Sequence, residues 1–189
     1  QETETSDEVY IYRRQNSDGA KVYGMNVELK YAPNQKWLIQ TGATLQEAKF
    51  DKAIQWSDDL NVPASRAFNE TPNLYGNFIA TYAPTKNFQN NLSAVYTGPM
   101  KVQHLGGPDA FIPKSKLETS PSFFELNWKS SYQFHLDKHK HTYLKIYGGI
   151  QNIFNSYQND FDQGVNRDVT YNYGPQRPRT YFFGVKIGN

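Results

Sequence analysis

Residues 23–31 alternate strictly between two kinds of side chain. Apolar or aromatic residues occupy every odd position, and glycine, polar or charged residues occupy every even one. Because successive side chains of a β-strand point to opposite faces, a strand here has one apolar and one polar face. Its length also matches the roughly 9–11 residues that a tilted strand needs to cross the hydrocarbon layer. The segment therefore predicts a strand between lipid and water.

The same alternation recurs along the chain. It predicts further two-faced strands at residues 37–46, 74–82, 91–103, 124–136, 144–150 and 181–188, with Met100 and Val102 on the apolar face of the third. Gly148 and Gly149 are a candidate position for a bulge that shifts the phase. A first strand near residues 9–14 has no clear face. The pattern predicts an all-β, antiparallel transmembrane β-barrel segment of about eight strands.

Composition supports a barrel and excludes other classes. The chain has no run of about 18 apolar residues, so we expect no membrane-spanning helix. The mean hydropathy of −0.76 suits a barrel whose lumen and loops are polar, and 14 tyrosines fit aromatic girdles at the membrane interfaces. The absence of cysteine excludes thiolate metal sites, and a net charge of +2 without a basic cluster indicates no nucleic-acid partner.

Short and long connections alternate. Residues 31–35, 82–87 and 137–140 predict tight turns, whereas residues 51–69, 104–120 and 157–177 predict long loops rich in Gly, Pro, Asp or Asn. Outer-membrane barrels have short periplasmic turns and longer external loops. We therefore expect the three long loops outside and the C-terminus on the periplasmic side.

Short motifs follow one another in a fixed order in the second half of the chain. They include Tyr147-Gly148-Gly149-Ile150-Gln151-Asn152-Ile153-Phe154-Asn155, then Tyr173-Gly174-Pro175 and Arg177-Pro178-Arg179. Thr71-Pro72-Asn73 and Thr97-Gly98-Pro99 precede them. In this order the motifs resemble the C-terminal end of TonB-dependent outer-membrane receptors. The resemblance covers most of the chain from about Gly24 onward, although the position at which many barrels end in an aromatic residue is held by Asn189.

The resemblance implies a fold and a function. Residues 1–189 would be the C-terminal portion of a 22-stranded barrel, and the plug and earlier strands would be absent. The polar opening of residues 1–7 is no signal peptide, which fits a mature protein or a piece of one. The intact receptor would sit in the outer membrane of a Gram-negative bacterium and take up a large nutrient, such as a ferric siderophore or cobalamin. Its partners would be membrane lipid, the remaining barrel strands, the plug and the TonB energy-coupling complex.

The long loops carry the candidate ligand contacts. Aromatic side chains there can stack on a large ligand or pack the loops on one another, and an arginine can meet an anionic group. The predicted ligand-contact residues are Trp56, Phe111, Phe161, Arg167, Tyr171 and Tyr173. Arg177 and Arg179, at the outer end of the last strand, can meet an anionic ligand or pair with loop aspartates.

Two groups of side chains suggest metal sites but favour solvated loops. Asp160, Asp162, Asn166 and Asp168 have a spacing that could surround Ca²⁺, yet the later acidic residue of an EF-hand loop is missing. His135, His139 and His141 straddle a lysine-rich turn and lack a carboxylate or cysteine partner. His104 stands alone. With no catalytic arrangement in the sequence, we expect neither an enzyme nor a cofactor.

Two alternatives remain open at this level. One is a complete small eight-stranded outer-membrane barrel with a structural or adhesion role, in which the first and last strands pair. The other is a soluble β-sandwich or lipocalin-like binder, which would bury the aromatic faces in a shared core. The positions of Trp128, Phe134 and Phe183 separate the second alternative from a membrane barrel.

Overall fold

The computed structural model describes residues 2–5, 9–12, 19–57, 61–136 and 142–188. Every regular element in this part is a β-strand, and the named strands pair antiparallel, as predicted. The strands are β1 (Glu2–Thr5), β2 (Val9–Tyr12), β3 (Ala20–Asn34), β4 (Trp37–Ile54), β5 (Ser65–Ala67), β6 (Leu74–Tyr82), β7 (Phe88–Thr97), β8 (Lys101–His104), β9 (Lys116–Thr119), β10 (Phe123–His135), β11 (Tyr143–Gln151) and β12 (Thr180–Gly188). Within these residues no helix has the length and apolar character needed to cross a bilayer.

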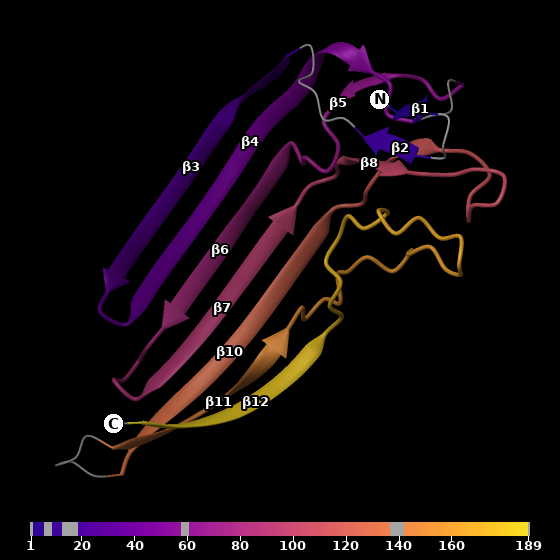
Figure 1. Cartoon of the computed structure of the whole chain (residues 1–189). Coiled ribbons are helices and arrows are strands. Elements are labelled where there is room, and N and C mark those ends of the chain that lie inside the picture. Colours follow the sequence, from indigo (N-terminus) through magenta and orange to yellow (C-terminus); the bar gives the residue numbers. More distant parts are fainter. Residues whose placement is uncertain (1, 6–8, 13–18, 58–60, 137–141, 189) are drawn as a thin grey trace.

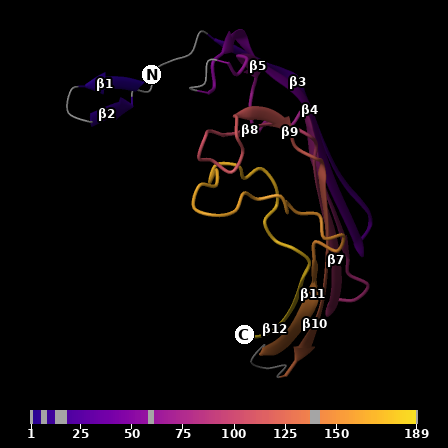
Figure 2. The same cartoon turned by 90° about the vertical axis from the view of Figure 1, so that its right-hand side faces the viewer.

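One curved sheet forms the body of the molecule (Figure 1). Its strand order is β12-β11-β10-β7-β6-β4-β3, and β5 pairs with the upper part of β4. Figure 2 shows this sheet from its side as a wall, with the β8–β9 hairpin and residues 152–179 on the concave side. Within the described residues β3 and β12 each have one neighbour, so the sheet is open and the predicted alternative of a closed small barrel is not formed.

The first predicted strand lies elsewhere. Of residues 9–14, Val9–Tyr12 form β2, which pairs with β1 in a separate two-stranded sheet. Residues 13 and 14 lie outside the described part of the chain.

Strand register carries the apolar face across the whole wall. One row of directly paired positions runs from β3 to β12 through Tyr31, Ile39, Ala80, Leu92, Trp128, Ile150 and Tyr181. Paired residues share a face, so the alternation read from single strands adds up to one continuous apolar surface. Trp128, Phe134 and Phe183 on this surface are 40%, 45% and 72% exposed. The alternative of a sandwich with a buried aromatic core is therefore wrong.

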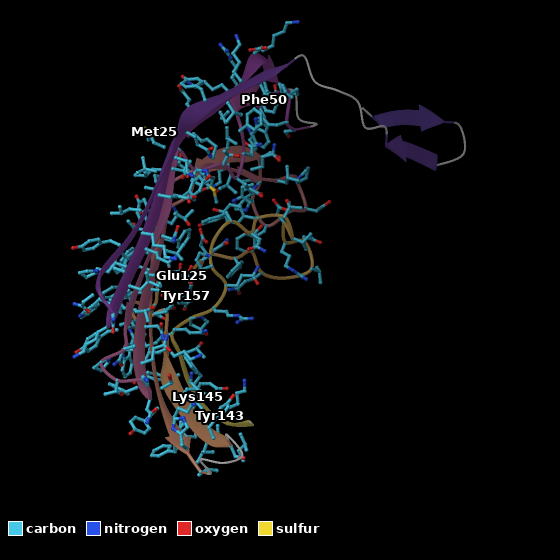
Figure 3. The ribbon with its side chains drawn as sticks, turned by 90° about the vertical axis from the view of Figure 1, so that its left-hand side faces the viewer. Met25, Phe50, Glu125, Tyr143, Lys145 and Tyr157 are labelled. Carbon is cyan, nitrogen blue, oxygen red and sulfur yellow. The ribbon has the colours of Figure 1, made fainter. Side chains whose placement is uncertain are left out.

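The opposite face of the wall is polar and concave. Phe123 and Asn127, which belong to it, contact residues 152–179, and these residues lie on the concave side of the wall. A hollow of about 500 Å³ on this face is lined by Glu28, Lys30, Gln40, Asn77 and their neighbours. Side chains project from both sides of the ribbon in Figure 3, which places Phe50 at the end with the long loops and Tyr143 at the opposite end.

Two predictions about β-strand details are corrected by the structure. Gly148 and Gly149 do not form a bulge, since β11 keeps one register with both neighbours. Glycine instead permits close packing: a Cβ on Gly149 would lie 2.1 Å from the carbonyl oxygen of Trp128. The strand predicted at residues 91–103 ends at Thr97, where Gly98 and Pro99 interrupt the pairing.

Val102, predicted on the lipid-facing side, is buried instead. It belongs to β8, which pairs with β9 as a hairpin separate from the wall, and its side chain is 1% exposed. The alternation continues through Gly98 and Pro99 in the sequence, but the break in pairing there redirects the chain.

The alternation of short and long connections matches the prediction in the described residues, whereas the predicted tight turn at residues 137–140 lies outside them. At one end of the wall β3 and β4, like β6 and β7, are joined by short turns, and the first of these is stabilised by the bond from the Lys36 N–H to Asn34 Oδ1 at 2.9 Å. At the other end lie the long connections 55–73, 98–122 and 152–179. We call residues 152–179 the terminal loop. The candidate site lies between this loop and the β8–β9 hairpin.

Candidate ligand-binding loops

The terminal loop is closed at its base by Asn152, a residue of the motif that carries the family resemblance. Its side chain is 2% exposed. The amide oxygen accepts from the N–H of Ser156 at 2.8 Å, and the amide nitrogen donates to the carbonyls of Ser156 and Arg177 at 3.1 and 2.9 Å. The backbone φ of 49° lies in the left-handed region, which asparagine tolerates better than most residues. Asn152 thus holds the two ends of the loop together.

A second pair of motif residues strengthens this closure. The Oδ1 atom of Asn155 accepts from the N–H of Arg179 at 2.8 Å, and the Nε of Arg179 donates to the carbonyl of Ile153 at 2.8 Å. The Asn-Ile-Phe-Asn and Arg-Pro-Arg segments therefore bind each other directly. For Arg179 the structure shows a backbone carbonyl as partner, rather than the predicted loop aspartate.

Gln158 organises the middle of the loop. Its side chain is 1% exposed, its Oε1 accepts from the N–H groups of Tyr173 and Gly174 at 2.9 and 3.1 Å, and its Nε2 donates to the carbonyl of Tyr171 at 3.2 Å. A buried amide that satisfies three backbone groups replaces the ladder that a β-hairpin would use. This one side chain therefore bonds to three backbone groups of the returning half of the loop, at residues 171, 173 and 174.

His104 connects the β8–β9 hairpin to the terminal loop. Its Nδ1 lies 2.7 Å from Oε1 of Glu118 on β9, and its Nε2 lies 2.9 and 3.1 Å from the two carboxylate oxygens of Asp162. The ring of Tyr171 stacks on the imidazole. His104 is 5% exposed, and the Asp162 side chain is 1% exposed. We call these four residues the His104 cluster.

Hydrogen bonds set the protonation behaviour around the cluster. Burial tends to raise the pKa of the Glu118 carboxyl, but hydrogen bonds from Lys116 and His104 outweigh it and lower that pKa below its ordinary value. The pKa of Asp168 is also lowered, because bonds from Thr170 and the Leu105 N–H outweigh its burial. Both carboxylates are therefore charged at neutral pH.

The pKa values of Tyr171 and Tyr173 in the terminal loop shift in the opposite direction. Burial, reinforced by the charges of Asp160 and Glu118, raises the pKa of Tyr171 to about 12. Burial and the hydrogen bond to Asp160 raise the pKa of Tyr173 as well. Both phenols stay neutral and act as hydrogen-bond donors.

Backbone N–H groups of the hairpin donate further hydrogen bonds to the terminal loop. The N–H of Leu105 donates to Asp168 Oδ2 at 2.7 Å, and the N–H of Phe111 donates to the carbonyl of Asn166 at 3.1 Å. Asp162 Oδ2 accepts from the N–H of Asp168 at 3.0 Å within the loop. The hairpin and the loop therefore form one connected unit.

Three of the six predicted ligand contacts line one hollow in this unit. An open hollow of about 450 Å³ is bordered by Phe161, Arg167 and Tyr171, together with Asp162, Asp168, Val169, Asn172 and Gln176. Phe161 is 39% exposed and Arg167 is also exposed, whereas Tyr171 is 6% exposed and turns its ring toward His104. Phe161 and Arg167 are the predicted residues with surface available to a ligand here.

The other three predicted contacts lie outside the lining of this hollow. Tyr173 donates its hydroxyl to Asp160 Oδ2 at 2.6 Å and packs against Phe123. Phe111, 54% exposed, lies between β8 and β9 in the hairpin. Trp56 lies in the 55–73 connection, where its Nε1 donates to the carbonyl of Pro63 at 3.1 Å.

The aspartates of residues 160–168 accept hydrogen bonds from donor groups of the protein itself. Asp160 accepts from the hydroxyls of Tyr171 and Tyr173, Asp162 faces His104, and Asp168 accepts from backbone N–H groups. In the part of the chain that the structure describes, no group of three or more His, Cys, Asp or Glu side chains is arranged to hold a metal ion. His139 and His141 lie outside the described residues.

Sequence reasoning misses the His104 cluster. The sequence predicts a histidine that stands alone, but the fold places His104 against Glu118 and Asp162, which are 14 and 58 residues away in the sequence. No local spacing marks such a group. The one available signal is the presence of a histidine and several acidic residues in loops predicted at the same end of the barrel.

Comparison with known proteins places the fold. No family model and no curated protein matches the chain. The closed form of the ferric-catecholate import receptor Fiu from K12 E. coli aligns with a TM-score of 0.60 and 18% identity, over 97% of this chain and 22% of the receptor. The ferripyoverdine receptor of the outer membrane of Pseudomonas aeruginosa, bound to ferripyoverdine, aligns with a TM-score of 0.61 and 14% identity, over 88% and 19%. The FpvAI–pyocin S2 complex gives the same values.

These alignments establish the architecture. The predicted resemblance to the barrel region of TonB-dependent outer-membrane receptors is confirmed for the fold. The chain spans about a fifth of the length of the solved structures it matches. At 14–18% identity the likeness concerns architecture, because one fold carries many functions.

Proposed function

We propose that this chain is the C-terminal barrel wall and outer loops of an outer-membrane receptor that imports a large nutrient. The observation that carries the proposal is the continuous apolar convex face, on a sheet whose concave face is polar and whose two edge strands each have one neighbour within the described residues. An unpaired strand edge is not tolerated in a bilayer, so further strands have to complete the wall. The alignments with two iron-compound receptors over 88–97% of the chain support the same conclusion.

The edges and the polar concave face of the sheet indicate where further strands and a plug domain would bind. Strands before β3 would pair with its free edge, and β12 would pair with the first strand of the barrel. A plug domain would fill the lumen against Glu28, Lys30, Gln40 and neighbouring polar groups. Coupling to the TonB complex of the inner membrane would act through the N-terminal part of such a receptor. The chain itself would contribute no catalysis and bind no cofactor.

The ligand in this proposal is a large molecule held at the outer loops. A ferric siderophore is favoured over cobalamin, because both aligned receptors are named for iron compounds. Among the predicted contacts, the exposed Phe161 and Arg167 border the hollow and would touch the ligand directly. Phe111 and Trp56 would contact it from neighbouring loops. Tyr171 and Tyr173 would support the hollow from behind.

Transport in iron-starved cells tests the proposal. The full-length protein that contains this chain is expressed in a Gram-negative strain that lacks its own siderophore receptors. Uptake of radioactive iron is measured with ferric catecholates, ferripyoverdines and ferric hydroxamates, and uptake of labelled cobalamin is measured in parallel. We expect one ligand class to be taken up, and uptake to stop when a protonophore collapses the proton gradient. Uptake that continues without the gradient would contradict energy-coupled import.

Two substitutions localise the ligand. Phe161→Ala is expected to weaken binding of the transported ligand by on the order of tenfold, because an aromatic contact contributes about 1–2 kcal/mol. Phe154→Ala is the matched control, since Phe154 is 59% exposed but packs on Phe124, which belongs to the apolar face. Equal effects of both substitutions would place the ligand away from the hollow.

A further inference from the structure

The His104 cluster adjoins the hollow in the terminal loop. Asp162 and Tyr171 border the hollow, and both contact the His104 imidazole. Asp162 is also the sequence neighbour of Phe161, and its carboxylate receives the N–H of Asp168 at 3.0 Å. His104 is therefore in direct contact with two of the residues that border the hollow.

Charge makes His104 the central residue of this contact. Ionised carboxylates only accept hydrogen bonds, whereas the doubly protonated imidazolium has an N–H on each ring nitrogen and can donate to Glu118 and Asp162 at once. Lys116 also pairs with Glu118 at 2.8 Å. Within the described residues, however, His104 is the one basic side chain paired with Asp162. Removing one partner from a buried ion pair leaves an uncompensated charge, which is strongly unfavourable.

We propose that His104 is a positioning residue that holds the terminal loop against the β8–β9 hairpin and thereby sets the shape of the ligand-binding hollow. The part that concerns ligand affinity rests on the proposed function. The part that concerns the loops does not, because the contact between hairpin and loop can be measured without any ligand.

The loop contact is tested by the distance between two spin labels. The chain contains no cysteine, so Asp109→Cys on the hairpin and Val165→Cys on the loop introduce unique labelling sites within it. Val165 is 95% exposed, and Asp109 is also exposed, so the labels do not disturb packing. In the ligand-free, full-length protein in lipid vesicles we expect one narrow distance distribution. His104→Ala should broaden it, whereas the control His135→Ala, an exposed histidine at the opposite end of β10, should leave it unchanged.

A second substitution that removes a carboxylate charge distinguishes positioning by ion pairing from simple space filling. In His104→Ala, the buried carboxylate of Asp162 and the half-buried carboxylate of Glu118 face an empty site, and Asp162 is the one left without a basic partner among the described residues. Adding Asp162→Asn removes one of these charges and should narrow the distance distribution again, whereas adding Glu28→Gln on the concave face should not. Amide exchange in residues 158–174 should accelerate on the order of tenfold to a hundredfold in His104→Ala. It should slow again when Asp162→Asn is added, but not when Glu28→Gln is added.

Ligand affinity completes the test. Binding is measured with whichever ferric catecholate, ferripyoverdine or ferric hydroxamate the parent protein takes up. We expect His104→Ala to weaken binding of that compound by about tenfold or more, and His135→Ala to leave it unchanged. An unchanged label distance in His104→Ala would overturn the proposal, and so would a loosened loop with unchanged affinity. If the parent protein binds none of the ligands tested, the proposed import function fails, while the label distances still decide whether His104 holds the two loops together.

Discussion

The imidazole ring of His104 lies flat against the phenol ring of Tyr171, with ring centroids 3.7 Å apart and ring planes inclined by 12°. Tyr171 remains neutral because burial raises its pKa to about 12. Its ring can therefore stabilise a protonated imidazole through its electron-rich face. This contact joins two long connections that share no β-ladder in the described chain.

Acidification should separate the two connections. The pKa values of Glu118 and Asp168 are lower in the folded loops than their ordinary values of 4.5 and 3.8, so their stabilising effect is complete above those values. It is lost as the pH falls through the lowered values. We expect the distribution of distances between labels at Asp109 and Val165 to stay constant from about pH 7 to pH 5 and to broaden only as the pH falls below the ordinary pKa values of these two carboxyls.

Amide variants check the origin of this acid response. Glu118→Gln and Asp168→Asn should each weaken the contact at neutral pH and reduce the further change on acidification. A broadening centred near pH 6 in the parent protein would contradict the assignment to these two carboxylates.

Asn152 is expected to be the most sensitive position at the base of the terminal loop. Asn152→Ala removes three side-chain hydrogen bonds and places an alanine at a φ of 49°. We expect loop closure to lose about 2–4 kcal/mol, measured as faster amide exchange in residues 153–179. Asn152→Gly loses the same bonds without the backbone strain, so it should lie between Asn152→Ala and the parent. Equal effects of the two variants would show that strain plays no part.

The strands of the wall could be predicted from the sequence because the alternation of apolar and polar side chains is visible within each strand. A strand between lipid and water needs a two-residue period, and residues 23–31 display that period within nine positions. The prediction was wrong where the chain left the sheet: the alternation through Val102 continued after the pairing had ended at Thr97. The period of a sequence does not report whether a neighbouring strand is present.

The loops could be predicted only in position and composition. His104 meets Asp162 across 58 residues, and Gln158 satisfies backbone groups 13–16 residues away. Such contacts depend on how two irregular segments fold over each other, and no periodicity encodes them. The motif containing Asn152 is visible in the sequence as a resemblance, but its physical role becomes clear only from its hydrogen bonds to Ser156 and Arg177.

Close packing of Tyr147 over Gly184 should make this glycine important for the last strand pair. A Cβ at Gly184 would lie 2.3 Å from Cζ of the Tyr147 ring, so Gly184→Ala forces the ring away. We expect a loss of about 1–3 kcal/mol in the stability of the full-length protein in lipid vesicles, measured by denaturant unfolding. Gly107→Ala is the matched control, since a Cβ at Gly107 would have no atom within 4 Å. A neutral Gly184→Ala would show that the ring is free to move.

The two faces of β3 should lie in different environments, lipid on the convex face and polar groups on the concave face. Leu29 is 58% exposed on the convex face, and Lys30 follows it on the concave face at nearly the same height in the membrane. In the full-length protein in lipid vesicles, a spin label at Leu29→Cys should collide often with dissolved oxygen, which concentrates in hydrocarbon, and rarely with a water-soluble nickel chelate. A label at Lys30→Cys should show lower accessibility to oxygen, because polar groups and the proposed plug surround it. If both labels were equally accessible to the nickel chelate, the convex face would be in water, and the assignment of this sheet to a membrane wall would fall.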